Sequence, residues 1–136
     1  MGLMKTKAIS SIFVLFAIAA GMASMAPAAY ADHAEVSIGA VEESGFSQSC
    51  VETGCYTPSV LTIKSGTIVT MTNTDTTGVH TFTSGTVDGF TPIPAGMFDS
   101  EVLMPGDAYE RKFSQKGTFD YYCMLHTWMT GQIIVE

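Results

Sequence analysis

The feature that most constrains the fold is a series of short segments, between residues 35 and 136, that alternate apolar with polar residues and are separated by turn residues. A period of two is typical of β-strands with one buried face, and no segment of this region sustains the period of an amphipathic helix. The predicted strands span residues 35–38, 59–64, 67–73, 79–84, 99–104, 108–113, 118–123 and 132–136. Eight such strands predict an all-β fold of two packed antiparallel sheets, with loops gathered at the two ends.

Alternation within a strand also predicts which side chains face inward. In the strand expected at 118–123, Phe119, Tyr121 and Cys123 share one face, which we assign to the core. The stretch 85–96 contains Gly or Pro at five positions and is predicted to be one long loop.

Residues 1–31 have the organisation of a signal peptide. Lys5 and Lys7 precede an uncharged apolar run, and Ala29-Tyr30-Ala31 has the small-x-small pattern that a signal peptidase cleaves. Cleavage would leave residues 32–136 as one domain of 105 residues. The alternative is retention of the segment as a membrane anchor, because the uncharged run is long enough to span a bilayer. We therefore expect an exported protein, periplasmic, pseudoperiplasmic or extracellular, either free or tethered to a membrane.

The charge balance limits the class of partner. The chain has a net charge of −7, and cleavage would remove Lys5 and Lys7 but none of the 13 acidic residues, leaving −9. Such a field argues against nucleic acid as a partner. It is compatible with a basic docking partner or with a soluble acidic surface that has no specific partner, and we expect a monomer.

Three cysteines are present, and an exported protein meets an oxidising environment in which cysteines pair. Cys50 and Cys55 lie in one turn-rich segment and are predicted to form a disulfide that closes a short loop. Two free thiols or a second metal site are the alternatives. Cys123 is left unpaired and needs its own explanation.

Cys123 ends a predicted strand and is followed by His126 and Met129, so that a thiol, an imidazole and a thioether occupy one short loop. Of the remaining histidines, His80 begins a predicted strand, whereas His33 is too close to the expected new N-terminus to be a good candidate. Cu(II) favours nitrogen donors and Cu(I) favours soft sulfur, and this donor set suits both. The sequence therefore predicts one copper ion bound by His80, Cys123, His126 and Met129.

Zinc binding and catalysis are two other uses of such residues. Zinc also binds histidine and cysteine, but a thioether is a poor zinc ligand. An enzyme is not expected, because Met129 would fill the coordination position that a substrate or water needs.

The chain resembles the cupredoxins, the type 1 (blue) copper proteins, in Cys123-x-x-His126-x-x-Met129 before Gly131 and, at long range, in Asn73-x-Asp75 and His80-Thr81. The spacing of the loop is most similar to amicyanin, and the whole domain resembles archaeal plastocyanin-like or halocyanin-like proteins. The resemblance covers roughly residues 59–136. It implies an eight-stranded Greek-key sandwich with copper at one end. It also implies that the amide of Asn73 ties the two ligand-bearing loops together by hydrogen bonds and that Thr81 supports the ligands.

The function implied by the resemblance is electron transfer between redox partners outside the cytoplasm, with one copper cycling between Cu(II) and Cu(I). Electrons would leave through the exposed edge of His126, and partners would dock on an apolar rim at Met124, Leu125 and Trp128. The alternative is an extracytoplasmic copper carrier or storage protein, which would need ready metal release and no fixed methionine ligand.

Overall fold

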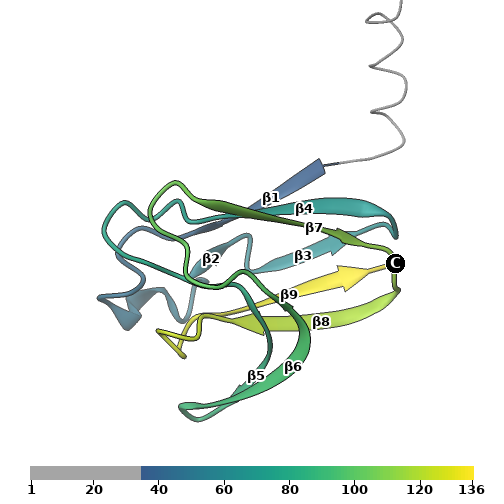
Figure 1. Ribbon diagram of the computed structural model, residues 1–136. Coiled ribbons are helices and arrows are strands. Elements are labelled where there is room, and N and C mark those ends of the chain that lie inside the picture. Colours follow the sequence, from purple (N-terminus) through teal and green to yellow (C-terminus); the bar gives the residue numbers. More distant parts are fainter. Residues whose placement is uncertain (1–34) are drawn as a thin grey trace, which may run out of the picture. The chain divides into compact units, whose positions relative to one another are not determined.

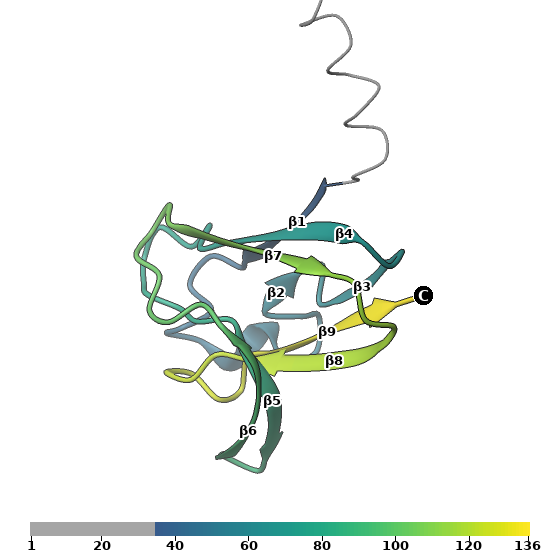
Figure 2. The ribbon, with the colours of Figure 1, turned by 45° about the vertical axis from the view of Figure 1, so that its right-hand side comes forward.

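The computed structural model describes residues 35–136, so the predicted signal peptide and His33 lie outside the described residues. The all-β prediction is confirmed: two sheets face each other across a common core (Figures 1 and 2). One sheet has the strand order β2-β1-β4-β7 and the other the order β3-β9-β8-β5-β6. Within the described range, no helix has the length and hydropathy needed to cross a bilayer.

The nine strands are β1 (Glu35–Ala40), β2 (Tyr56–Thr57), β3 (Val60–Ile63), β4 (Thr67–Thr72), β5 (Thr83–Asp88), β6 (Thr91–Asp99), β7 (Ala108–Phe113), β8 (Gly117–Tyr122) and β9 (Thr130–Val135). A short 3-10 helix, η1 (Gln48–Cys50), interrupts the segment between β1 and β2. The prediction for β7 is confirmed at both ends, and those for β1, β3, β4, β8 and β9 differ from the structure by one or two residues at one or both ends. The prediction of antiparallel sheets is wrong in part, because β1 pairs with β4, and β3 with β9, in parallel.

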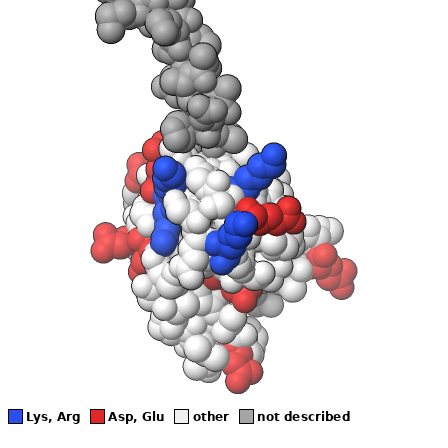
Figure 3. Space-filling model, turned by 90° about the vertical axis from the view of Figure 1, so that its right-hand side faces the viewer, with Lys and Arg blue, Asp and Glu red and all other residues white. Residues whose placement is uncertain are grey.

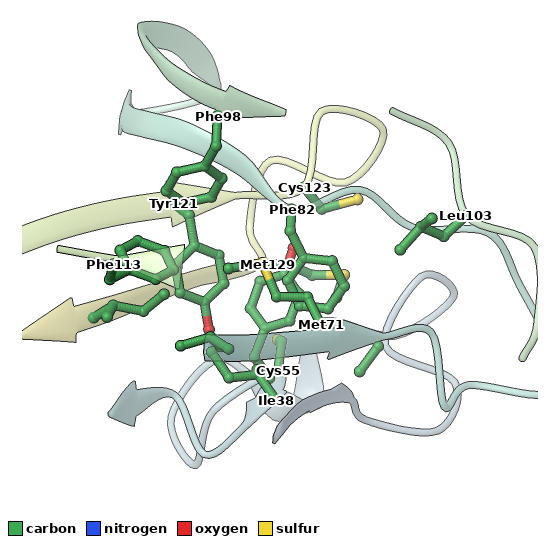
Figure 4. Packing of buried hydrophobic residues seen from close by; sticks show 14 of the residues in the cluster. Ile38, Cys55, Met71, Phe82, Phe98, Leu103, Phe113, Tyr121, Cys123 and Met129 are labelled. Carbon is green, nitrogen blue, oxygen red and sulfur yellow. The ribbon is translucent and has the colours of Figure 1, made fainter. Parts of the chain in front are cut away.

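The core lies between the sheets and is rich in aromatic side chains (Figure 4). On β4 every second residue is buried, which places Val69 and Met71 inward. Tyr121 from β8 is also buried, and its ring centroid lies 4.8 Å from that of Tyr56. Tilted pairs of this kind add to the free energy gained from burying apolar area. The expected inward face of β8 is confirmed for Tyr121 and Cys123, whereas Phe119 is only partly buried.

The prediction of a long loop at 85–96 is wrong, because these residues belong to the antiparallel hairpin of β5 and β6. The prolines are tolerated because β6 is the outer strand of its sheet, where a missing N–H need not break a ladder. Gly85 is required by the close approach of the two strands: a Cβ there would lie 2.3 Å from the carbonyl oxygen of Ile93. Here Gly and Pro mark a hairpin at a sheet edge.

Two other predicted strands are wrong in extent. The strand expected at 79–84 begins only at Thr83, and that expected at 99–104 is represented by the end of β6 and by Leu103, which forms an isolated bridge with His80. A side chain supplies one of the hydrogen bonds that a regular strand pair would make here. The hydroxyl of Ser100 accepts a hydrogen bond from the backbone N–H of Phe82, at 2.8 Å. These irregular segments form the end of the sandwich that carries the predicted ligands.

Candidate metal centre

The loop from Cys123 to Met129 connects β8 to β9 at the end of the sandwich opposite the C-terminus (Figure 1). Backbone hydrogen bonds close it tightly: the N–H of Cys123 donates to the carbonyl of Met129, at 3.1 Å, and the N–H of Met129 donates to that of His126, at 2.9 Å. Cys123 and Met129 are therefore adjacent, and both are fully buried. The loop therefore carries a thiol, an imidazole and a thioether, and the residues at its two ends are held side by side.

His80 reaches the same place from a separate segment, between β4 and β5. Its backbone pairs with Leu103 through two hydrogen bonds, of 3.2 and 2.9 Å, and its side chain is fully buried. Burial alone would lower the pKa of His80, but Cys123 and Asp75 raise it above the ordinary value. A buried histidine with a fixed backbone is well suited to present one ring nitrogen in a constant direction.

Three donor atoms converge. The Sγ of Cys123 lies 3.8 Å from Nδ1 of His80 and 3.6 Å from Nδ1 of His126, and the two Nδ1 atoms are 3.3 Å apart. Ligands that bind one ion at roughly 2.0–2.3 Å are separated from one another by roughly 3.3–3.8 Å at tetrahedral or trigonal angles. The donor set and its spacing therefore fit a single metal ion, and these residues form the cluster of metal-binding side chains in the described range.

The thiol of Cys123 is in surroundings that favour the thiolate. Burial would raise its pKa, but the contact with His80 and the hydrogen bond from the backbone N–H of Thr81, the latter at 3.4 Å, lower it below the ordinary value. Metal binding requires the deprotonated sulfur. Thr81 also accepts, at Oγ1, a hydrogen bond from the N–H of Met124, at 2.8 Å, and so joins the His80 segment to the Cys123 loop.

Asn73 is fully buried behind His80. Its Nδ2 donates to the carbonyls of Gly78 and Leu103, at 2.8 and 2.9 Å, and its Oδ1 accepts from the N–H of Asp75. These bonds hold the segment that carries His80. The resemblance implies that the amide of Asn73 links the two ligand-bearing segments. In the structure the direct link is made by Thr81 instead.

The role of Asp75 could not be predicted from the sequence. This carboxylate is fully buried, and its Oδ2 lies 2.7 Å from Nε2 of His80, on the side of the ring away from Cys123. Burial would raise its pKa, but hydrogen bonds from His80, Thr77 and the N–H of Glu43 lower it to about 2. The only sequence signal was its position two residues after Asn73, which does not reveal a contact with His80.

His126 is half-buried, and the segment before the disulfide packs against it. At Gly45 a Cβ would lie 2.8 Å from Cε1 of His126, so only a glycine fits without displacing the ring. The indole N–H of Trp128 donates to the carbonyl of Ser44, at 2.8 Å, and the indole ring lies 5.3 Å from that of His126. Burial and the charge of His80 lower the pKa of His126. Neither Ser44 nor Gly45 could be identified from the sequence.

The predicted disulfide between Cys50 and Cys55 is confirmed, and Cys123 is the free cysteine of the described residues. The disulfide closes residues 50–55 of the segment between β1 and β2, and Ser44 and Gly45, earlier in the same segment, lie against Trp128 and His126. Phe46 and Val51, in this segment, are 76% and 53% exposed. Met124 and Leu125 of the ligand loop are about half exposed as well, whereas Trp128 is mostly turned inward. The exposed apolar surface at this end is thus wider than the predicted rim.

Charge is distributed unevenly between the two ends of the sandwich. The basic residues of the described chain are Lys64, Arg111, Lys112 and Lys116. They lie after β3, in the second half of β7 and before β8, which is the end away from Cys123, and Figure 3 views this end. Among the described residues the end with the donor atoms has carboxylates, including Glu42, Glu43 and Glu101, and no lysine or arginine.

Comparison with known proteins identifies related sequences. A family profile described as cupredoxin-like domain matches residues 12–135. Amicyanin-alpha from Methylorubrum extorquens is 37% identical over 76 residues, which are 54% of this chain and 58% of that protein. The chain therefore aligns with little more than half the length of this curated relative.

Solved structures with the same fold include a purple cupredoxin from Nitrosopumilus maritimus, with a TM-score of 0.62 and 32% identity over 74% of this chain and 99% of that one. The copper-containing nitrite reductase of Thermus scotoductus matches with a TM-score of 0.54 and 27% identity, over 75% of this chain but only 22% of the enzyme. The match to the purple cupredoxin thus covers nearly that whole protein, whereas the reductase shares only one portion.

Proposed function

The chain belongs to the cupredoxin family, whose members bind copper, and we propose that it is a one-electron carrier with copper held by His80, Cys123, His126 and Met129. The observation that carries the proposal is the convergence of one thiol sulfur and two Nδ1 atoms within 3.8 Å of one another. Bound copper would supply a reversible Cu(II)/Cu(I) couple, to which this mixture of nitrogen and sulfur donors is suited.

The chain's own residues would keep the site in one geometry during electron transfer. His80, Cys123 and Met129 are fully buried, and the backbone bonds of the loop restrict their movement. A site that cannot rearrange has little reorganisation to undergo when the charge changes. The same burial opposes ready metal release, which supports a carrier of electrons over a carrier or store of copper. We propose, too, that the protein is not an enzyme, because Met129 would fill the coordination position that a substrate or water needs.

We infer that electrons pass at the half-exposed edge of His126. Exposed apolar residues lie in the ligand loop, at Met124 and Leu125, and next to Gly45, at Phe46. A partner protein would contact this apolar surface, and the carboxylates at the same end would favour a partner with a basic rim. We propose that the chain acts as a monomer in this exchange.

We propose an extracytoplasmic location. The disulfide between Cys50 and Cys55 supports it, because such bonds persist in oxidising compartments. Cleavage or retention of residues 1–31, which the structure does not describe, would decide whether the domain diffuses or is tethered.

The role of Met129 can be tested by voltammetry of the copper-loaded protein. Met129→Leu, which removes the sulfur and keeps the volume, should raise the reduction potential, because the remaining donors stabilise Cu(II) less well. Met129→Gln should lower it. Met104→Leu is the matched control, since Met104 is 56% exposed on another segment. The reduction potential of this variant should equal that of the parent.

The same experiment distinguishes the two functions. An electron carrier requires a reversible one-electron wave and retention of copper in both oxidation states. Loss of Cu(I) to a soluble chelator during cycling, or equal shifts in the Met129 and Met104 variants, would contradict the proposal.

A further inference from the structure

Asp75 is a buried carboxylate that the proposed ligand set does not require. It lies in the segment between β4 and His80, and none of its side chain is exposed. Removing a carboxylate from water is costly unless its charge is compensated and its oxygens accept hydrogen bonds. The position of Asp75 therefore needs a reason beyond the packing of a loop.

The two oxygens of Asp75 have different tasks. Oδ1 accepts hydrogen bonds from the N–H of Thr77 at 2.9 Å, from the hydroxyl of Thr77 at 2.5 Å and from the N–H of Glu43 at 3.1 Å. Oδ2 lies 2.7 Å from Nε2 of His80. Donors from two separate segments thus fix the carboxylate and direct its other oxygen at the imidazole.

This contact determines which nitrogen of His80 carries the proton. A neutral imidazole has one N–H and one lone pair, and a carboxylate can accept only from the protonated nitrogen. With Nε2 protonated, the lone pair is on Nδ1, which is the atom that lies 3.8 Å from Sγ of Cys123 and 3.3 Å from Nδ1 of His126. Carboxylates that orient metal-binding histidines in this way also make them stronger donors.

We propose that Asp75 is a positioning residue for His80: it fixes the tautomer with Nδ1 facing the metal centre, and its buried negative charge favours Cu(II) over Cu(I). The first half concerns the metal-free protein. The second half rests on the proposed copper site. Asp75 would then help to set the reduction potential. It would do so through the ring of His80, since its carboxylate contacts Nε2 of His80 and not one of the three converging donor atoms.

The tautomer is tested without copper. Long-range proton–nitrogen NMR spectra of the metal-free parent, recorded in alkaline solution, should show His80 protonated at Nε2 alone. Asp75→Asn should give a mixture of tautomers, because an amide can either accept from Nε2 or donate to it. Protonation of His80 at Nδ1 in the parent would overturn the proposal, and this result does not depend on whether the variant folds or on whether copper is the native metal.

The charge effect is tested by the ratio of Cu(II) to Cu(I) affinity. Asp75→Asn should reduce this ratio about tenfold, which corresponds to a potential about 59 mV higher for a one-electron couple. Glu43→Gln is the matched control: it removes one charge from an exposed side chain whose backbone N–H contacts Asp75. Its shift should be much smaller.

Equal shifts in the Asp75 and Glu43 variants would overturn the charge effect, because Asp75 would then act like any nearby carboxylate. A parent that binds no copper would contradict the proposed function and the charge effect, whereas the NMR result would still decide the tautomer.

Discussion

The two histidines of the candidate site lie in contrasting surroundings. His80 is fully buried, pairs with Leu103 through its backbone and contacts Asp75 through its outer nitrogen. His126 is half-buried and is supported by Gly45, which lies in the segment before the disulfide, and by Trp128. We call these two surroundings the inner region and the outer region. The difference indicates a division of tasks: the inner region fixes the electronic properties of the site, and the outer region controls access to it.

The largest expected effect separates the two histidines directly. His80→Gly and His126→Gly should each abolish the intense visible absorption of the copper-loaded protein, because each removes a ligand. Added imidazole should restore it readily in His126→Gly, where the gap opens near the surface. In His80→Gly restoration should need about tenfold more imidazole or fail, because the gap is closed by buried side chains. Titration with imidazole, followed by absorbance, measures this difference, and equal restoration would contradict the division into two regions.

A smaller effect is expected on the electron-transfer rate. Leu125→Glu places a negative charge in the apolar contact surface without touching a donor atom, so electron self-exchange should slow by about tenfold or more while the potential stays nearly constant. Ile93→Glu is the control, since Ile93 is similarly exposed but lies on the β5–β6 hairpin. Stopped-flow kinetics would measure both. A Leu125→Glu protein as fast as the parent would show that electrons leave elsewhere.

The smallest effect concerns the support of His126. Gly45→Ala should destabilise the folded protein by roughly 1 kcal/mol and perturb the visible spectrum, because the new Cβ forces the ring of His126 to move. Gly78→Ala is matched to it, since a Cβ at Gly78 would lie 3.7 Å from Oδ2 of Asp75, which is an ordinary contact. Thermal unfolding should show a lower Tm for Gly45→Ala only. The same Tm in both variants would mean that the close contact at Gly45 does not support His126.

The sequence allowed the prediction of residues whose chemistry is local. Cys123, His126 and Met129 occupy one short loop, and Cys50 and Cys55 lie five positions apart, so their association needs no knowledge of the fold. The packed two-sheet fold was also predictable, because alternation within a strand reports its buried face.

His80 was predictable although it lies 43 positions from Cys123, because His33 was the other histidine left as a candidate. The residues that could not be predicted depend on other contacts between distant segments. Asp75 meets Glu43 across 32 positions, and the indole of Trp128 meets Ser44 across 84. The hairpin of β5 and β6 was missed for a different reason: Gly and Pro are signals for loops, but an edge strand can contain both. Periodicity cannot distinguish a loop from an edge strand when neither face is buried.

The central claim is that one copper ion is bound through the thiolate of Cys123, and titration of the metal-free protein with Cu(II), followed by visible absorption, tests it most directly. The account predicts an intense thiolate-to-copper band that saturates at one copper per chain. It also predicts that Cys123→Ser, with an unchanged far-ultraviolet circular dichroism spectrum, lacks this band. A parent without the band, or a Cys123→Ser protein that retains it, would contradict the assignment of the site.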